Sequence, residues 1–220
     1  MLIPLSRILI WVRHCATLAK MGLVRAMFLL WAPLGQCLSL KTTAPVVNAY
    51  IHIPFCRRRC FYCDFPITVV GDGGPGDERS EKYVAMLERE ALATAECEGL
   101  GAASAAAGGL QTVYLGGGTP SLLAPSLVER VLRGLVCESF GGLAPGCEVT
   151  LEMDPGTFDA GRLDAYLAAG VTRVSLGVQS WDAGTLEAAG RAHCVADAEE
   201  AVELLNRATC EFSARGKTGK

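Results

Sequence analysis

Acidic residues are absent from the first part of this 220-residue chain, in which the first one is Asp64. Residues 1–44 are rich in Leu, Ile, Val, Met and Trp. Their charged side chains are all basic, namely Arg7, Arg13, Lys20, Arg25 and Lys41. An apolar leader with arginines and no acid is typical of an organellar transit peptide, which predicts a mitochondrial or chloroplast location. The alternatives are a cytoplasmic protein whose leader has no role, and a membrane anchor.

A long hydrophobic run is also lacking. The longest uncharged stretch of the leader, residues 26–40, has 15 residues and contains Pro33 and Gly35. A membrane-spanning helix needs ~20 apolar residues. We therefore predict that the chain has no membrane span.

A strong net charge and a high density of cysteine are missing as well. The net charge is −3 and no basic stripe is present, which predicts no nucleic-acid partner. Ten cysteines in 220 residues are too few for a disulfide scaffold, and their spacings show no framework. Half of the residues are apolar and a fifth are charged, as in ordinary globular proteins, and the length fits one full domain.

The chain does contain a C-x3-C-x2-C array, formed by Cys56, Cys60 and Cys63 after a short apolar run. Cysteines at this spacing converge only if the backbone between them curls into a tight loop. Three thiolates on one loop form a soft site suited to zinc or to an iron–sulfur cluster, in a reducing compartment. Three ligands leave one position open, which a catalytic metal centre needs and a structural one does not.

A structural zinc site with His52 as the fourth ligand is the alternative. Such sites usually combine two ligand pairs a dozen or more residues apart, whereas these four ligands lie within residues 52–63. A disulfide with a spare thiol is a weaker alternative. The other cysteines have no ligand spacing and are predicted to be incidental: Cys15, Cys37, Cys97, Cys137, Cys147, Cys194 and Cys210.

Strand-like and helix-like patterns alternate after Pro45. The expected strands are 46–55, 112–115, 148–153 and 171–178, and the expected helices are 78–98, 125–140, 159–169, 183–189 and 198–207. This alternation predicts βαβ units with a parallel sheet, an α/β fold. The low-complexity segment 100–109 is predicted to be a surface loop, and Asp197 the N-cap of the last helix.

The cysteine array and its neighbours, YIHIPFC and CFYCDFP, resemble the signature of the radical S-adenosylmethionine (SAM) superfamily. Three further segments resemble it in the same order: LGGGTPSLL at 115–123, EVTLEMDPGTF at 148–158 and RVSLGVQSWD at 173–182. The branch resembled holds the oxygen-independent coproporphyrinogen III oxidases and the HemW-type haem chaperones.

The resemblance implies a partial radical SAM (β/α)6-type barrel. It extends through about four βα units, so we expect an incomplete core at residues 45–207. The leader 1–44 precedes this core, and a polar tail, residues 208–220, follows it and matches nothing in the family. We expect a truncated gene model or splice form.

The resemblance also implies that the three cysteines hold a [4Fe–4S] cluster whose fourth iron binds SAM. The SAM contacts that it implies are Tyr50, Tyr62, Gly117, Gly118, Thr119, Glu152, Gln179 and Arg191. Arg191 would pair with the carboxylate of SAM through a charge-assisted bond. Without the resemblance, the glycine run is a simple turn, Glu152 a solvated strand end, and the two tyrosines core residues.

Two functions from different classes follow from this branch. One is a haem chaperone that passes haem to respiratory proteins, and the other is an oxidase that decarboxylates coproporphyrinogen III. Oxidases of the family carry a further cysteine two residues after the third ligand, where this chain has Phe65, which favours the chaperone. An electron donor is a further expected partner, and a haem site would lie outside this chain. No catalytic residue is assigned, and an inactive fragment is the third alternative.

Overall fold

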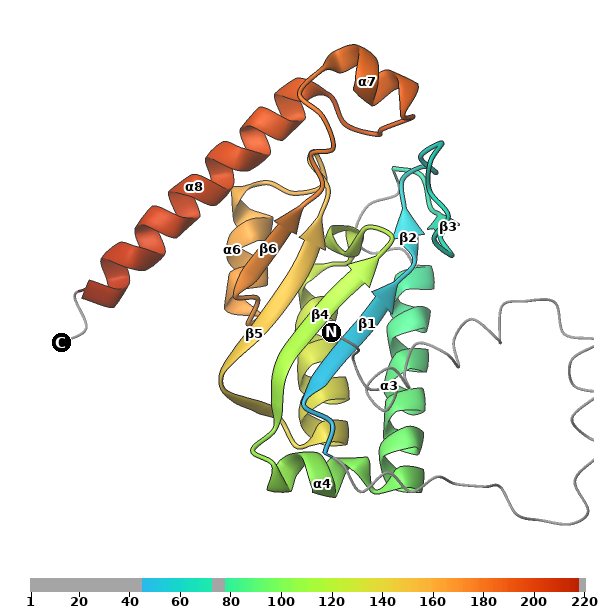
Figure 1. Cartoon of the computed structure of the whole chain (residues 1–220), viewed down its shortest axis with the longest axis vertical. Coiled ribbons are helices and arrows are strands. Elements are labelled where there is room, and N and C mark those ends of the chain that lie inside the picture. Colours follow the sequence, from blue (N-terminus) through green and yellow to red (C-terminus); the bar gives the residue numbers. More distant parts are fainter. Residues whose placement is uncertain (1–44, 73–77, 218–220) are drawn as a thin grey trace, which may run out of the picture.

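The computed structural model describes residues 45–72 and 78–217, so the predicted leader lies outside the described residues. In these ranges, one parallel sheet has the strand order β1-β4-β5-β6 (Figure 1). Its strands are β1 (Asn48–Ile53), β4 (Leu110–Gly117), β5 (Leu143–Met153) and β6 (Arg173–Leu176). A second, two-stranded parallel sheet consists of β2 (Phe55–Cys56) and β3 (Thr68–Val69). The predicted α/β fold with a parallel sheet is confirmed.

Helices connect the strands of the four-stranded sheet, and two further helices, α7 and α8, follow β6. The helices are α3 (Glu78–Glu98), α4 (Leu100–Ala106), α5 (Pro125–Arg130), α6 (Ala160–Ala168), α7 (Ala183–Ala188) and α8 (Val195–Lys217). A 3-10 turn, η2 (Pro120–Leu122), precedes α5, and a π-helix, η3 (Val131–Glu138), continues it. Within the four-stranded sheet, each strand lies beside the next strand of that sheet along the sequence, as in a partial (β/α) barrel. None of the helices within 45–72 and 78–217 is long and apolar enough to cross a membrane.

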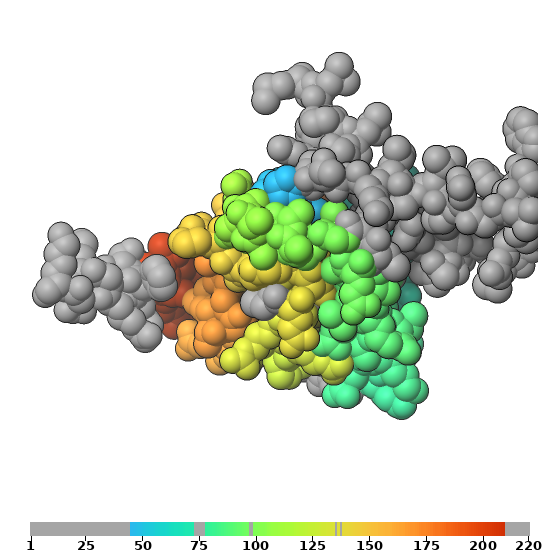
Figure 2. Space-filling model, turned by 90° about the horizontal axis from the view of Figure 1, so that it is seen from below, coloured from blue at the N-terminus to red at the C-terminus, as the bar shows by residue number. Residues whose placement is uncertain are grey.

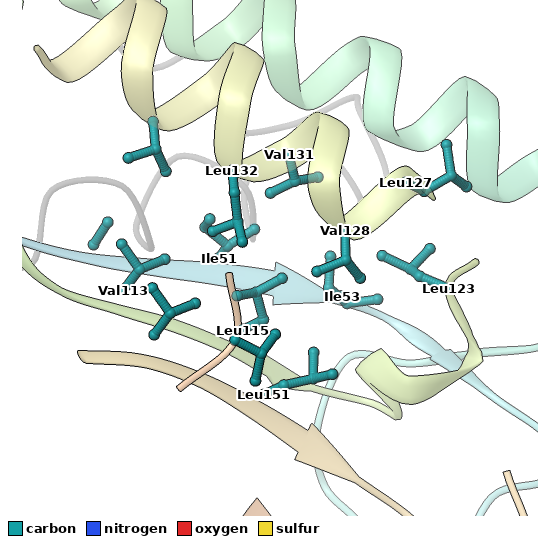
Figure 3. Close-up of a cluster of buried hydrophobic side chains, with 14 of the residues drawn as sticks. Ile51, Ile53, Val113, Leu115, Leu123, Leu127, Val128, Val131, Leu132 and Leu151 are labelled. Carbon is teal, nitrogen blue, oxygen red and sulfur yellow. The ribbon is translucent and has the colours of Figure 1, made fainter. Parts of the chain in front are cut away.

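The main core lies between the sheet and the helices of one face. Alternation along β1 directs Ala49, Ile51 and Ile53 inward, all of them buried. In Figure 3, side chains of α5 and η3 meet side chains of β1, β4 and β5 in one apolar layer, which includes Ile51, Ile53, Val113, Leu115, Leu123, Leu127, Val128, Val131, Leu132 and Leu151. Burial of this apolar layer is the main interaction that holds the helices on the sheet.

The alternate residues of the same strands form the other face of the sheet. The register places Tyr50 beside Tyr114, and Tyr114 beside Thr150. Glu152 lies two residues further along β5, on the same face as Thr150. Tyr50, Tyr114, Thr150 and Glu152 on this face are polar or aromatic, in contrast to the apolar layer on the other face.

The prediction of a surface loop at 100–109 is wrong. Residues Leu100–Ala106 form helix α4, in which Leu100 and Ser104 are buried. Alanine has the highest helix propensity, and the buried Leu100 anchors one face of this alanine-rich turn. Gly109 lies against the segment that leads into β5, since a Cβ there would be 2.7 Å from the carbonyl oxygen of Gly142. The view from below shows these green and yellow segments side by side (Figure 2).

The start of α8 also differs from the prediction. The helix begins at Val195, so Asp197 lies in its first turn and is not the N-cap. Its carboxylate accepts a hydrogen bond from the backbone N–H of Cys194 at 2.7 Å, which is the role of the third residue in a capping box. The helix continues to Lys217 and crosses the expected boundary between residues 207 and 208.

Tyr166 on α6 offers a test of the packing. Its side chain is 0% exposed, and its hydroxyl lies 2.8 Å from the carbonyl oxygen of Ser121 and 2.7 Å from that of Leu123. Arg162 bonds the same two carbonyl groups, so Tyr166→Phe leaves neither acceptor unpaired. We expect this variant to lower the free energy of unfolding by about 1 kcal/mol, measured by urea titration.

Tyr62→Phe is the control for this measurement, because Tyr62 is 55% exposed. Its free energy of unfolding should stay within about 0.5 kcal/mol of the parent value. Equal stabilities of the two variants would contradict an anchoring role of the Tyr166 hydroxyl.

Candidate functional site

The cysteine loop begins where β2 ends. Cys56 is the last residue of β2, and the N–H of Cys63 donates to the carbonyl oxygen of Cys60 at 3.1 Å, which closes a turn. Arg59 Nη1 donates to the carbonyl oxygens of Cys63 and Phe65, at 3.0 and 3.3 Å. The three cysteines are free thiols and partly exposed. The predicted tight loop is therefore present, with its thiols open to a ligand.

The three thiols lie within electrostatic reach of one another. Burial raises the pKa of the Cys56 thiol, and the neighbouring Cys63 and Cys60 raise it further. The Thr119 hydroxyl, 3.5 Å from Cys56 Sγ, acts in the opposite direction. In residues 45–72 and 78–217, no group of three His, Cys, Asp or Glu side chains is arranged around a single metal ion. The ligands of an iron–sulfur cluster bind different irons, so they need not converge on one point.

The glycine run packs against the start of the cysteine loop. Gly117 has φ 115°, and a Cβ there would lie 2.4 Å from the His52 ring. A Cβ on Gly118 would lie 2.7 Å from the carbonyl oxygen of Phe55, and the Thr119 N–H donates to that oxygen at 2.7 Å. The absence of side chains thus allows the β4 end to lie directly against the backbone between β1 and β2.

Glu152 is held on the polar face by two donors. Its Oε1 accepts from the Tyr114 hydroxyl at 2.7 Å, and its Oε2 accepts from the Gly117 N–H at 3.0 Å. Tyr50 stacks on Tyr114 with ring centroids 5.9 Å apart. Burial raises the pKa of Tyr50 to about 12, so its hydroxyl stays protonated at neutral pH. Sequence reasoning missed Tyr114, although its position two residues before Gly116 on the same strand face was a usable signal.

Arg191 lies against the cysteine loop. Its Nη1 is 3.3 Å from Cys60 Sγ and 3.2 Å from the Tyr62 hydroxyl. Its Nη2 bonds Asp154 and donates to the carbonyl oxygen of Gly177 at 3.0 Å. The guanidinium, predicted to face the carboxylate of SAM, is thus already paired with a carboxylate of the chain. Sequence reasoning missed Asp154, which directly follows the last residue of β5.

Gln179 lies beyond the end of β6. Its φ is 63°, and it is the one non-glycine residue with a positive φ in the part of the chain that the structure describes. Such a conformation is costly for a residue with a side chain, and strain of this kind concentrates at functional sites. The role of Gln179 in binding SAM stays a prediction, as do the roles of the other seven implied contacts.

The structure brings most of the predicted residues to one edge of the sheet. The cysteine loop, the glycine run, Glu152 and Gln179 all follow or end parallel strands, so they share the edge formed by the strand ends. Glu152 contacts the glycine run, and Arg191 contacts Cys60 and Tyr62. Tyr50 lies further back on β1, where it contacts Tyr114 and His52.

Comparison with protein families matches residues 50–215 to the radical SAM superfamily. This chain belongs to the radical SAM superfamily. It is 42% identical over 169 residues to the heme chaperone HemW of Synechocystis sp., a match that covers 74% of this chain and 37% of the relative. It is 35% identical over 165 residues to the mitochondrial radical S-adenosyl methionine domain-containing protein 1 of Mus musculus, covering 75% of this chain and 34% of that protein.

A solved radical SAM structure has the same fold. The coproporphyrinogen III oxidase HemN of Escherichia coli matches with a TM-score of 0.62 and 25% identity, covering 77% of this chain and 36% of that one. The chain therefore spans between a third and two fifths of the length of these relatives.

Membership in the radical SAM superfamily implies a [4Fe–4S] cluster and SAM, and the residues present fit both. The donor set is three soft thiols on one loop, one ligand short of four. Arg191 Nε is buried and has no hydrogen-bond partner in the described part of the chain, so one donor remains at the site for an anion.

The cysteine ligands can be tested by metal content. Cys60→Ala removes one of the three thiols, so we expect most of the iron and sulfide to be lost after anaerobic reconstitution. Iron and sulfide per chain are measured chemically. Cys147→Ala is the matched control, since Cys147 lies on β5, away from the loop, and its loss should leave both values unchanged. Unchanged iron in Cys60→Ala would exclude the proposed cluster ligation.

The support of Glu152 by Tyr114 can be tested through SAM affinity. Tyr114→Phe keeps the stacking on Tyr50 and removes only the hydroxyl that orients Glu152. We expect the dissociation constant of SAM to rise about fivefold, because a hydrogen bond contributes about 1 kcal/mol. Equilibrium binding to the reconstituted protein measures it. Tyr166→Phe, whose lost hydroxyl bonds Ser121, Leu123 and Arg162 rather than Glu152, should bind SAM as the parent does. Equal affinity of Tyr114→Phe would count against the role of Tyr114.

Proposed function

We propose that this chain is a HemW-like radical SAM protein that acts as a haem chaperone and passes haem to respiratory proteins. The observation that carries the proposal is Phe65, which stands two residues after Cys63, where oxidases of the branch have a further cysteine. Phe65 is 53% exposed, and its carbonyl oxygen accepts from Arg59, so the position belongs to the ordered loop. The 42% identity to a protein named heme chaperone HemW supports the same choice.

In this proposal Cys56, Cys60 and Cys63 would hold three irons of the cluster. The cluster, when bound and reduced by an electron donor, would supply the electron that cleaves SAM. Glu152 would accept hydrogen bonds from SAM, because Tyr114 and the Gly117 N–H fix the orientation of its carboxylate. The remaining implied SAM contacts, Gly118, Thr119, Tyr50, Tyr62, Gln179 and Arg191, lie at or behind the same edge.

We further propose an organellar location. The leader 1–44 carries basic and no acidic residues, and the mouse relative is named as mitochondrial. The transit peptide and the haem acceptor are both parts of this proposal.

The oxidase is the second candidate, because the solved fold match is a coproporphyrinogen III oxidase. It would require decarboxylation of coproporphyrinogen III with consumption of SAM. The chain would then have to decarboxylate coproporphyrinogen III with Phe65, and not a cysteine, two residues after Cys63.

One experiment separates the two candidates. The full chain is reconstituted anaerobically, titrated with haem by absorbance, and assayed for SAM consumption and for decarboxylation of coproporphyrinogen III. The chaperone proposal requires unchanged coproporphyrinogen and saturable haem binding by this chain, a result that would correct the expectation of a haem site outside it. Decarboxylation would overturn the chaperone proposal in favour of the oxidase, and absence of both activities would identify an inactive fragment.

A cysteine outside the C-x3-C-x2-C loop could also bind haem, so the assay needs a control. Cys194 is exposed and lies at the start of α8. Haem binding that survives Cys194→Ala supports a specific site, whereas binding that is lost in this variant would be adventitious thiolate ligation.

A further inference from the structure

Asp154 is a largely buried carboxylate at the centre of a cluster of basic side chains. Its side chain is 13% exposed, and Arg191, with a side chain 10% exposed, donates to its Oδ1. His193 Nδ1 lies 3.3 Å from the same oxygen, and Arg57 Nη2 lies 3.9 Å from Oδ2. Burial raises the pKa of Asp154, and the neighbouring Arg191, His193 and Arg57 act against this rise. A carboxylate so enclosed needs these partners to remain charged.

The same cluster joins three separate parts of the chain. Asp154 follows β5, Arg57 belongs to the cysteine loop, and Arg191 and His193 precede α8. Arg57 also donates to the carbonyl oxygen of Pro155 at 3.2 Å, and His193 Nε2 lies 3.1 Å from that of Val178. Asp154 is thus fixed from several sides, so it can act as a rigid anchor.

Arg191 uses the two ends of its guanidinium differently. Nη2 is engaged by Asp154 and by the carbonyl oxygen of Gly177, while Nη1 is directed to Cys60 Sγ and the Tyr62 hydroxyl. Because the guanidinium is planar and rigid, fixing Nη2 also fixes the direction of Nη1. The position of the cation beside Cys60 therefore depends on Asp154.

We propose that Asp154 is a positioning residue that holds Arg191 against Cys60, and that Arg191 thereby raises the reduction potential of the cluster that Cys60 ligates. The proposal deepens the proposed function at the same site and rests on it only for the presence of the cluster. Reduction adds one negative charge to the cluster. A hydrogen bond from a cation to a ligand sulfur stabilises that charge, and the low exposure of Arg191 limits its screening by water.

The test is a double-mutant cycle on the midpoint potential of the reconstituted full chain, followed by redox titration with electron paramagnetic resonance. Asp154→Asn keeps the shape and removes the charge that anchors Arg191, so we expect the potential to become more negative. Arg191→Met should lower it further. In the Arg191→Met background, Asp154→Asn should no longer lower the potential. Without Arg191, the substitution only removes a negative charge near the cluster, and that change does not lower a reduction potential.

A merely electrostatic role of Asp154 gives the opposite result. Removing its negative charge would raise the potential, by the same amount with and without Arg191. That outcome, or an unchanged potential in Asp154→Asn, would overturn the proposal. Asp159→Asn is the matched control, since Asp159 caps α6 and should leave the potential unchanged.

Loss of Arg191 leaves Asp154 buried beside fewer cations, so iron content and thermal unfolding are checked for every variant. If Arg191→Met does not retain iron, Arg191→Lys replaces it in the cycle. A single ammonium cannot hold Asp154 and reach Cys60 as the guanidinium fork does, so the same loss of coupling is expected.

Haem titration of the same samples keeps the proposals apart. Absent haem binding with shifted potentials would reject the chaperone alone, and unshifted potentials with intact haem binding would reject the positioning role alone.

Discussion

The parallel register of the sheet is the constraint on which the site depends. β1, β4, β5 and β6 all run in one direction, so their carboxyl ends meet at a single edge. The segments that follow them carry the cysteine loop, the glycine run, Asp154 and Gln179. A shift of one residue in any strand would turn its polar face into the core. The buried alternate residues, such as Ile51 and Leu115, prevent that shift, so core packing and site geometry are set by the same pattern.

The cysteine loop, in turn, is supported by segments remote in the sequence. The N–H of Phe61 donates to the carbonyl oxygen of Ala189 at 3.0 Å, and Arg191 contacts Cys60. A Cβ on Gly190 would lie 3.1 Å from the Phe61 ring, so glycine permits this close approach. The region around α7 therefore supports the cysteine loop, and substitutions there should alter the positions of the thiols.

Local patterns were enough to predict the sheet and most helices, and α3 has the predicted bounds, Glu78–Glu98. They failed at 100–109, where low complexity was interpreted as a loop although alanine favours helix and Leu100 packs inward. The cysteine loop was predictable because its ligands are close in sequence. Tyr114 and Asp154 were missed, since the partners that define their roles lie 38 and 37 residues away, a distance that local spacing does not encode.

The pairing of Arg191 bears on how a cofactor carboxylate could be bound. A guanidinium has five N–H donors, and here Nη1 and Nη2 are engaged by Cys60, Tyr62, Asp154 and Gly177. Among the nitrogen atoms of Arg191, Nε is the one that is buried and has no hydrogen-bond partner in the described part of the chain. A carboxylate reaching Arg191 would therefore bond Nε or displace the exposed Tyr62 hydroxyl, since displacing Asp154 would leave a buried carboxylate with fewer cations. On these energetics Asp154 would remain in place, and the same arginine would serve both the thiol loop and a bound carboxylate.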